Sequence, residues 1–383
     1  MTDNKQDILN KLRILEEEKE KLINQLQSFE VNSLQKHASN FTVQEKINIF
    51  RSLFKGRQDV YARRFENSAT HKSGYYPVKN KEEFLPVTDE VIKSHLQGYS
   101  RKEFSYQKYK KDFTVGIYPL LQDDATNFLA IDFDGEKYKN EVKHFADICK
   151  SLRLPAYIEI SRSGCGAHIW FFFDSPIAAY TARKLGTFLL SKTMEECPQI
   201  KFSTFDRMFP AQDILPKGGL GNLIALPLQN KPRKQGNSIF VDENFAAFED
   251  QWKFLSEIKK ISLNEIENII SKTGHSFNAL FEDMSYNTRN TKKEISFDNI
   301  KLPAKINAVL KNAIYIDIEN IPPKLLNEIM KLAVFRNPEF YKMQAMRLPV
   351  YNKPRVISCA DVTDKYAAIP RGCLNELNSL LTK

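Results

Sequence analysis

The chain has 383 residues, of which 42% are hydrophobic and 27% are charged, as expected for a globular protein with two or three domains. Its formal net charge of +9 favours a polyanionic partner such as nucleic acid, although a solvated basic surface would give the same value. The five cysteines form no CxxC pair, no apolar run could span a membrane and no signal peptide opens the chain, so we expect a cytoplasmic protein without structural disulfides or zinc.

The first predicted element is a helix over residues 1–30, a segment without glycine or proline. Its apolar residues follow an alternating four-three spacing, at Ile8, Leu12, Leu15, Leu22, Leu26 and Phe29. This helix forms either a short coiled coil, through which the chain self-associates, or a solvated helix docked on its own domain. Next come an amphipathic helix over Val43–Phe54, a loop-rich segment that ends near Pro86, and a helix over Asp89–Leu96.

Short apolar runs alternate with helical patterns between about Thr114 and Pro227. The runs VGIYPLL and FLAIDFD are predicted strands, and a helix is predicted over residues 139–152. AYIEIS and HIWFFF, joined by the small-residue loop RSGCGA, predict an antiparallel hairpin. A helix over residues 176–196 and two further strands, KFSTFD and NLIALPL, complete the series. This order predicts an α+β core with an antiparallel or mixed sheet, and argues against a doubly wound parallel sheet.

The end of the chain, from residue 296 onward, is predicted to be a small separate module. A helical pattern resumes over residues 250–280, and the polar stretch SYNTRNTKKE that follows is typical of a linker. We therefore divide the chain into a helical segment at 1–30, a main domain at 40–280 and a C-terminal accessory module at 296–383.

Two aspartates, Asp132 and Asp134, lie one residue apart at the end of the predicted strand FLAIDFD. Side chains alternate along a strand, so both carboxylates point to the same face, with Cα atoms about 7 Å apart. A divalent cation bound between them would offset their repulsion and accept their oxygen atoms as ligands. Pairs of this kind also occur in glycosyltransferases and at ordinary loop ends, so the pair alone does not define a metal site.

His168 begins the strand HIWFFF and shares a strand face with Trp170. It is therefore either a packed core histidine or a ligand-binding residue. The loop before it contains Ser163, Gly164 and Gly166, where exposed backbone N–H groups would let a phosphate approach closely. The same glycines could be needed for the hairpin turn alone.

A third carboxylate, Asp206, ends the alternating run KFSTFD. On a neighbouring strand it would complete a carboxylate cage for two divalent ions, the arrangement that supports phosphoryl transfer. Asp213, in the loop that follows, is the alternative third ligand. Further phosphate contacts are predicted from a glycine-rich turn and a basic cluster, at Gly218, Gly219, Gly221, Lys231, Arg233 and Lys234.

The order of DFD, then SRSGCGAHIWFF, then FDR with FPAQD and GNLIALPL, resembles the archaeo-eukaryotic primase superfamily of primase-polymerases. Within it, the chain is similar to the primase domain of TOTE conflict systems and to CRISPR-associated primase-polymerases. The resemblance covers about Phe50 to Cys373 and includes GRQDVYARR, SGYYPV and FRNPEFYKMQAMRLPVYNKPRVIS. It implies a primase core, in which an N-terminal α/β unit packs against an RRM-like unit with the metal site between them.

The resemblance also implies roles for individual residues. Asp132, Asp134 and Asp206 match the catalytic ligands of two Mg²⁺ or Mn²⁺ ions, and His168 matches the histidine that contacts the triphosphate of the incoming nucleotide. Further nucleotide-binding residues are expected at Ser163, Gly164, Gly166, Asn222, Arg233 and Lys234. Relatives often carry a cysteine cluster after the SGY segment, but this chain has no cysteine there, so no zinc is expected. Relatives often continue into a helicase, so the chain is either a fragment or a stand-alone form.

The sequence therefore predicts a template-dependent nucleotidyltransferase that synthesises primers or extends DNA. The implied partners are nucleoside triphosphates, a single-stranded or primed DNA template, and a helicase or a CRISPR adaptation protein, without a membrane. Two other classes remain open. A metal-dependent nuclease would use the same carboxylates and histidine. A nucleic-acid-binding module with an inactive site would keep the basic surface, but it would not need all three aspartates.

Overall fold

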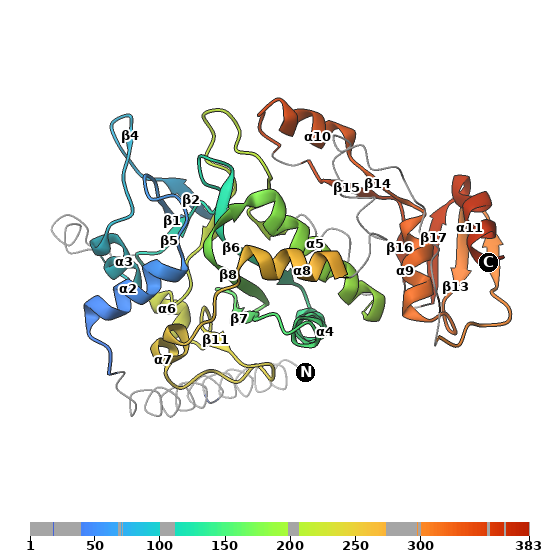
Figure 1. The fold of residues 1–383 in the computed structure, drawn as a ribbon, viewed down its shortest axis with the longest axis horizontal. Helices are drawn as coiled ribbons and strands as arrows, with labels where there is room; N and C mark the ends of the chain where they lie inside the picture. Colours follow the sequence, from blue (N-terminus) through green and yellow to red (C-terminus); the bar gives the residue numbers. More distant parts are fainter. Residues whose placement is uncertain are drawn as a thin grey trace, which may run out of the picture.

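The computed structural model (Figure 1) describes Glu18 and residues 40–67, 70, 72–99, 112–197, 207–272, 297, 300–350, 353–363 and 365–382. Three predicted features lie outside these residues: the helix over 1–30, the strand KFSTFD with Asp206, and the linker SYNTRNTKKE. Within the described part of the chain, no helix is long and apolar enough to cross a membrane.

The N-terminal unit combines a four-stranded antiparallel sheet with two helices. The sheet order is β10 (Ile224–Ala225), β5 (Val115–Ile117), β1 (Ala62–Asn67) and β2 (Lys72–Pro77). Helix α2 (Val43–Leu53) begins at a capping box, in which Thr42 and Glu45 satisfy each other's backbone N–H groups. Helix α3 (Asp89–Gln97) ends at Gly98, whose left-handed φ of 77° suits glycine. A two-residue hairpin pair, β3 (Lys79–Asn80) and β4 (Glu83–Phe84), follows β2.

The central unit is a five-stranded sheet in the order β11-β7-β8-β6-β9, in which all neighbours are antiparallel. Its strands are β6 (Ala125–Asp134), β7 (Tyr157–Ile160), β8 (Gly166–Ala178), β9 (Met208–Phe209) and β11 (Phe240–Val241). Helices α4 (Tyr138–Ser151) and α5 (Ala179–Glu196) pack on one face of this sheet. Three shorter helices follow in the chain: α6 (Asn230–Arg233), α7 (Gln251–Ser256) and α8 (Leu263–Lys272).

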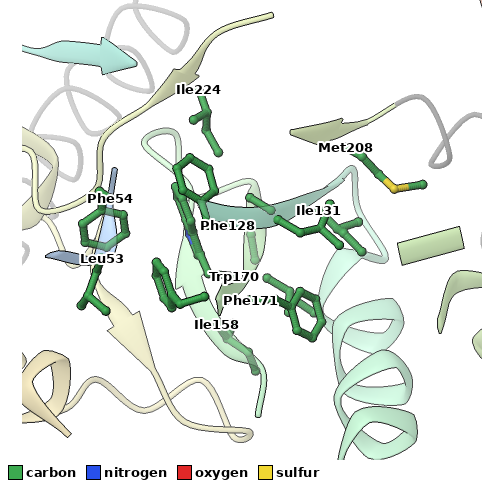
Figure 2. Packing of buried hydrophobic residues seen from close by; sticks show 14 of the residues in the cluster. Leu53, Phe54, Phe128, Ile131, Ile158, Trp170, Phe171, Met208 and Ile224 are labelled. Atoms are coloured by element: carbon green, nitrogen blue, oxygen red, sulfur yellow. The ribbon is translucent and has the colours of Figure 1, made fainter. Parts of the chain in front are cut away.

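The main hydrophobic core lies on both faces of this sheet (Figure 2). On one face, the ring of Trp170 packs edge-on against Phe54 at the end of α2, with ring centroids 5.1 Å apart. On the other face, α5 approaches the sheet closely because Gly186 has no side chain. A Cβ atom at this position would lie only 2.7 Å from Sδ of Met208. Each large apolar side chain buried in this way contributes about 1.5 to 3 kcal/mol. The first face therefore joins the central sheet to the N-terminal unit.

The C-terminal module has its own small core. Its antiparallel sheet has the order β12 (Ala308–Leu310), β13 (Ala313–Asp317), β17 (Tyr366–Pro370) and β16 (Asp361–Val362). Helices α9 (Pro323–Lys331) and α11 (Leu374–Leu381) pack with it, and a 3₁₀ turn (Arg371–Cys373) leads into α11. Between α9 and β16 the chain leaves the module as β14 (Val334–Arg336), α10 (Pro338–Ala345) and β15 (Val356–Ser358), which lie above α5 in Figure 1.

The α+β fold and most of the predicted elements are confirmed, including the hairpin of β7 and β8. Three predictions are wrong in detail. The segment before Pro86 is not mainly loop, because β1 and β2 pair within it. Residues 176–178 belong to β8, so α5 starts at Ala179. The helical pattern from residue 250 breaks into α7 and α8, because the chain at Ile261 bridges to Phe173 of β8.

Candidate active site

Asp132 and Asp134 lie on the same face of β6, as the alternation predicted. Asp132 pairs in register with His168 of β8, and Asp134 pairs with Gly166. Burial raises the pKa of Asp132, His168 opposes that rise, and the Asp134 carboxylate adds to it, so the net shift is upward. The two carboxylates therefore lie side by side on one face, with Asp132 largely buried and Asp134 exposed.

His168 is held by a buried carboxylate on the adjacent strand. Its Nδ1 lies 3.0 Å from Oε2 of Glu159, and its Nε2 faces Oδ1 of Asp132 at 3.7 Å. Trp170 Nε1 donates to the same Glu159 oxygen at 2.8 Å. Burial lowers the pKa of His168, but the Glu159 and Asp132 carboxylates outweigh it, so the net pKa is raised. This surrounding favours the imidazolium form and fixes the direction of the ring.

Glu159 received no role from the sequence, where it is part of the predicted strand AYIEIS. In the structure it is only 1% exposed, and Ser238 Oγ lies 3.4 Å from its second oxygen. The signal that could have revealed it is an acidic residue on the inward face of a short apolar strand. Because charges are rarely buried without a partner, such a residue implies a cation or strong donors nearby.

Arg207 reaches Asp134 from the next strand, with Nη1 2.9 Å from Oδ2. Its carbonyl oxygen accepts a hydrogen bond from the backbone N–H of Asp132 at 3.0 Å, just before β9 pairs with β6. Arg207 belongs to the FDR motif, of which only Asp206 was predicted to have a role. The chain next to the expected third carboxylate is therefore tied directly to the first two.

The loop between β7 and β8, which contains Ser163, lies beside Asp134. A side chain at Gly166 would collide with the Asp134 carboxylate and lie 2.6 Å from the Phe133 carbonyl oxygen. Gly164 has a left-handed φ of 76°, and a Cβ atom there would lie 2.8 Å from Oδ1 of Asn237. Ser163 Oγ accepts from the backbone N–H of Cys165 at 3.2 Å and so shapes the turn. The predicted phosphate-binding loop is therefore next to the paired aspartates.

Two of the other predicted nucleotide-binding side chains, Asn222 and Arg233, bind neighbouring backbone, and the third, Lys234, binds none within the described part of the chain. The Asn222 amide bridges the loop after β9: it donates to the Met208 carbonyl at 3.2 Å and accepts from Ala211 N–H at 2.9 Å. Arg233 is half-buried and donates to the Leu96 carbonyl at 3.2 Å. Lys234, at the end of α6, is exposed. The geometry makes Asn222 and Arg233 supports of the surrounding backbone, whereas Lys234 faces solvent.

Asp213, the alternative third ligand, is bound by two arginine side chains of the protein itself. Its oxygens accept two hydrogen bonds from Arg355, each 3.1 Å long, and Nε of Arg183 lies 3.0 Å from Oδ1. Burial would raise the pKa of Asp213, but the two guanidinium groups outweigh it and the net pKa is lowered. A carboxylate bound by two arginines is a poor metal ligand, which argues against this alternative.

In the described part of the chain, no three His, Cys, Asp or Glu side chains lie close enough to hold a metal ion. The described donors at the site are the carboxylates of Asp132 and Asp134, and the expected third ligand, Asp206, lies outside the described residues. Carboxylate oxygens suit hard cations such as Mg²⁺ and Mn²⁺. The carboxylates of Asp132 and Asp134 therefore fit part of a binding site for Mg²⁺ or Mn²⁺.

Comparison with known proteins identifies a family for this chain. The family described as the archaeo-eukaryotic primase domain of TOTE conflict systems matches residues 45–269. A search of curated proteins gives no match. Among solved structures, the polymerase domain of Mycobacterium tuberculosis ligase D in complex with DNA is 12% identical, with a TM-score of 0.33 over 62% of this chain and 91% of that chain. Since the family match spans more than half of the sequence and includes both paired aspartates, this chain belongs to the archaeo-eukaryotic primase domains of TOTE conflict systems.

Proposed function

We propose that the protein is a template-dependent nucleotidyltransferase, a primase-polymerase that joins nucleotides to a primer or to a first nucleotide on a DNA template. Membership of a primase family supports nucleotidyl transfer in general. The observation that carries the proposal is the pairing of Asp132 with His168 across two strands, beside Asp134 and the glycine-containing loop. Carboxylates for cations and a cationic histidine for phosphate then occupy one face of one sheet.

Asp132 and Asp134 would hold two Mg²⁺ or Mn²⁺ ions, together with Asp206 as the proposed third ligand. When bound, these ions would activate the attacking 3′-hydroxyl and neutralise charge on the leaving pyrophosphate. Two observations support the fit. The pKa of Asp132 is raised by burial and by Asp134, a cost that a bound cation would relieve. Arg207 holds the Asp134 carboxylate in place through a single partly solvated ion pair, which costs little to exchange for a cation, unlike the buried arginine pairs of Asp213.

His168 is proposed to bind the triphosphate of the incoming nucleotide. Glu159 accepts from its Nδ1–H, so Nε2 is directed towards Asp132 and the site. An imidazolium in this position donates a charge-assisted hydrogen bond to a phosphate oxygen, worth about 1.5 to 3 kcal/mol. The loop at Gly164 and Gly166 packs directly against Asn237 and the Asp134 carboxylate, which places it beside the proposed cation site. The protein supplies positioning and charge balance, and needs no covalent nucleophile.

The decisive experiment uses an end-labelled primer annealed to a longer DNA template, with Mg²⁺ or Mn²⁺ and either ribo- or deoxynucleotides. We expect stepwise lengthening of the label and release of pyrophosphate. Omitting the primer then tests initiation, where short new products on single-stranded template establish priming. Shortening of the label without nucleotides, lost in the Asp132→Asn variant, would replace this proposal with a metal-dependent nuclease.

A further inference from the structure

The segment from Val334 to Ser358, here called the arm, leaves the C-terminal module and reaches the central unit (Figure 1). It consists of β14, α10, β15 and their connections. Strands β14 and β15 pair with each other in antiparallel register, so the arm leaves and rejoins the module at one place. Its far end, around the C-terminus of α10, lies against the loop that follows β9.

Four buried polar side chains join the arm to that loop. Arg355 donates two hydrogen bonds of 3.1 Å to Asp213. Gln344 donates to the same carboxylate at 3.1 Å and accepts from the Asp213 backbone N–H at 3.1 Å. Arg183 of α5 lies 3.0 Å from the carboxylate on its other side. All four are hidden from solvent, with exposures of 8% for Asp213, 4% for Arg355, 7% for Gln344 and 2% for Arg183.

A second, more exposed contact lies beside this cluster. Arg347 of the arm donates to Oδ2 of Asp124 at 2.6 Å and to the Leu215 carbonyl at 3.0 Å. Its own carbonyl oxygen accepts from Lys217 N–H at 2.9 Å. The Arg347 and Asp124 side chains are partly solvated, so this ion pair contributes less than the buried cluster. The buried cluster and the Arg347 contacts therefore hold the same part of the loop, from Asp213 to Lys217.

That loop continues directly from the strand that supports the candidate active site. Arg183 donates to the Pro210 carbonyl at 2.8 Å, which ties the first turn of the loop to the Asp213 cluster. Just before this turn, β9 pairs with Ala130 and Ile131 of β6. One residue earlier, the Arg207 carbonyl accepts from the Asp132 backbone N–H. A continuous chain of bonded groups therefore runs from Arg355 to Asp132.

The chemistry of the cluster favours a fixed register over a sliding contact. A guanidinium that donates two parallel hydrogen bonds to a carboxylate accepts only a narrow range of positions. Phe340 and Tyr341 of α10 hold the Arg355 guanidinium over their rings, 5.4 and 5.5 Å from the centroids. Removing one partner of a buried ion pair leaves a charge that cannot be solvated. The arm is thus set in one position on the loop.

We propose that Arg355 and Gln344 are positioning residues for nucleotidyl transfer, because they hold Asp213 and through it fix β9, Arg207 and the backbone of Asp132. The C-terminal arm then contributes to catalysis by positioning active-site groups that it does not itself contact. The effect on catalysis rests on the proposed function, whereas the effect on β9 does not. Hydrogen–deuterium exchange measures the effect on β9, and primer extension measures the effect on catalysis.

The structural readout is hydrogen–deuterium exchange of the full-length chain, followed by mass spectrometry. Arg355→Met should speed exchange of peptides that cover residues 207–215 by about tenfold or more, because the buried Asp213 charge loses its main partner. Peptides from β7 and β8 should be unchanged. Gln344→Met, which removes two hydrogen bonds without changing charge, should give a smaller effect in the same peptides. Arg371→Met, at an exposed arginine of the same module, is the matched control and should change none of them.

The catalytic readout is primer extension by the same variants. We expect Arg355→Met to lower kcat by about tenfold or more and to raise the Mn²⁺ concentration for half-maximal rate, with little change in nucleotide KM. Arg355→Lys should restore part of kcat, since it keeps the charge but not the paired geometry.

Two outcomes would overturn the proposal: faster exchange confined to the arm, or a normal kcat although exchange in the 207–215 peptides is faster. If the wild-type chain extends no primer, the exchange data still decide whether the arm fixes β9. If Arg355→Met unfolds the whole chain, Gln344→Met carries both readouts.

Discussion

His168 and Glu159 lie opposite each other on β8 and β7, with imidazole Nδ1 3.0 Å from carboxylate Oε2. The buried glutamate also accepts from Trp170 Nε1, so its position does not depend on the histidine alone. This arrangement directs Nε2 of His168 towards Asp132 and favours the charged ring. His168, for which the sequence allowed either a packed core residue or a ligand-binding one, therefore faces the candidate active site.

Glu159→Gln is predicted to lower kcat/KM for nucleotide addition by about 10- to 100-fold, the equivalent of losing one charge-assisted hydrogen bond. Glutamine keeps the shape and can still accept from Trp170, so the melting temperature should change little. Steady-state primer extension measures the effect. Glu243→Gln, at an exposed glutamate paired with Lys150, is the matched control and should leave kcat/KM unchanged. An unchanged kcat/KM in Glu159→Gln would mean that His168 needs no carboxylate to act.

Replacing both Asp132 and Asp134 by asparagine is predicted to abolish primer extension without weakening binding to single-stranded DNA. The reason is that affinity for DNA rests on basic contacts with phosphates, whereas the carboxylates are proposed to hold cations. Fluorescence anisotropy with labelled DNA measures binding, and gel analysis of a labelled primer measures extension. Asp147→Asn, at an exposed position of α4, serves as the control and should keep both. Loss of DNA binding together with activity would contradict this division of roles.

Local patterns predicted the centre of the site well. Strands β6 and β8 are long and alternate regularly, so the shared face of Asp132 and Asp134 and the strand position of His168 followed from spacing alone. The fold class followed from the order of elements and from the resemblance. The register that places His168 opposite Asp132 did not follow, because it depends on pairing between segments far apart in the chain.

The missed features have two physical causes: polar surface strands lack an apolar pattern, and some side chains bind partners that the sequence does not place beside them. Strands β1 and β2 are half-exposed and charged, so their sequence lacks the apolar alternation that marks a buried strand. The Asp213 carboxylate resembled a loop-end metal ligand until Arg355, 142 positions later, was found bound to it. An acidic residue inside a short apolar strand indicates that Glu159 has a charged or donating partner, but only the structure identifies that partner as His168.

Gly166→Ala is predicted to destabilise the protein by about 1 to 3 kcal/mol and to reduce primer extension. The added methyl group would lie 2.6 Å from the Phe133 carbonyl oxygen and against the Asp134 carboxylate, so the β6–β8 pairing must shift. Chemical denaturation measures the free energy of unfolding, and the extension assay measures activity. Gly372→Ala is the matched control, because a Cβ atom there meets nothing within 4 Å. Equal stability of the two variants would show that the hairpin tolerates a side chain beside Asp134.

The last prediction concerns His95, a fully buried histidine of α3 that lies outside the candidate site. Its Nδ1 accepts from Val115 N–H at 3.1 Å and its Nε2 lies 2.8 Å from the Pro227 carbonyl, so the neutral ring satisfies both. Burial lowers the pKa of His95 to about 4; the Pro227 carbonyl opposes this, and Arg233 and Arg162 lower the pKa further. The ring therefore joins α3 to β5 only in its neutral form.

In the unfolded chain His95 takes up a proton below its ordinary pKa of 6.5, whereas the folded protein resists protonation down to about 4. Since the unfolded state binds the extra proton in this range, the free energy of unfolding should fall by about 3 kcal/mol as the pH drops from 6.5 to 4. Urea denaturation of the wild type and of His95→Gln at several pH values isolates this effect, because all other groups titrate alike in both. The wild-type advantage should shrink towards pH 4. A stability difference that stays constant with pH would show that His95 takes up its proton over the same pH range in the folded and the unfolded protein.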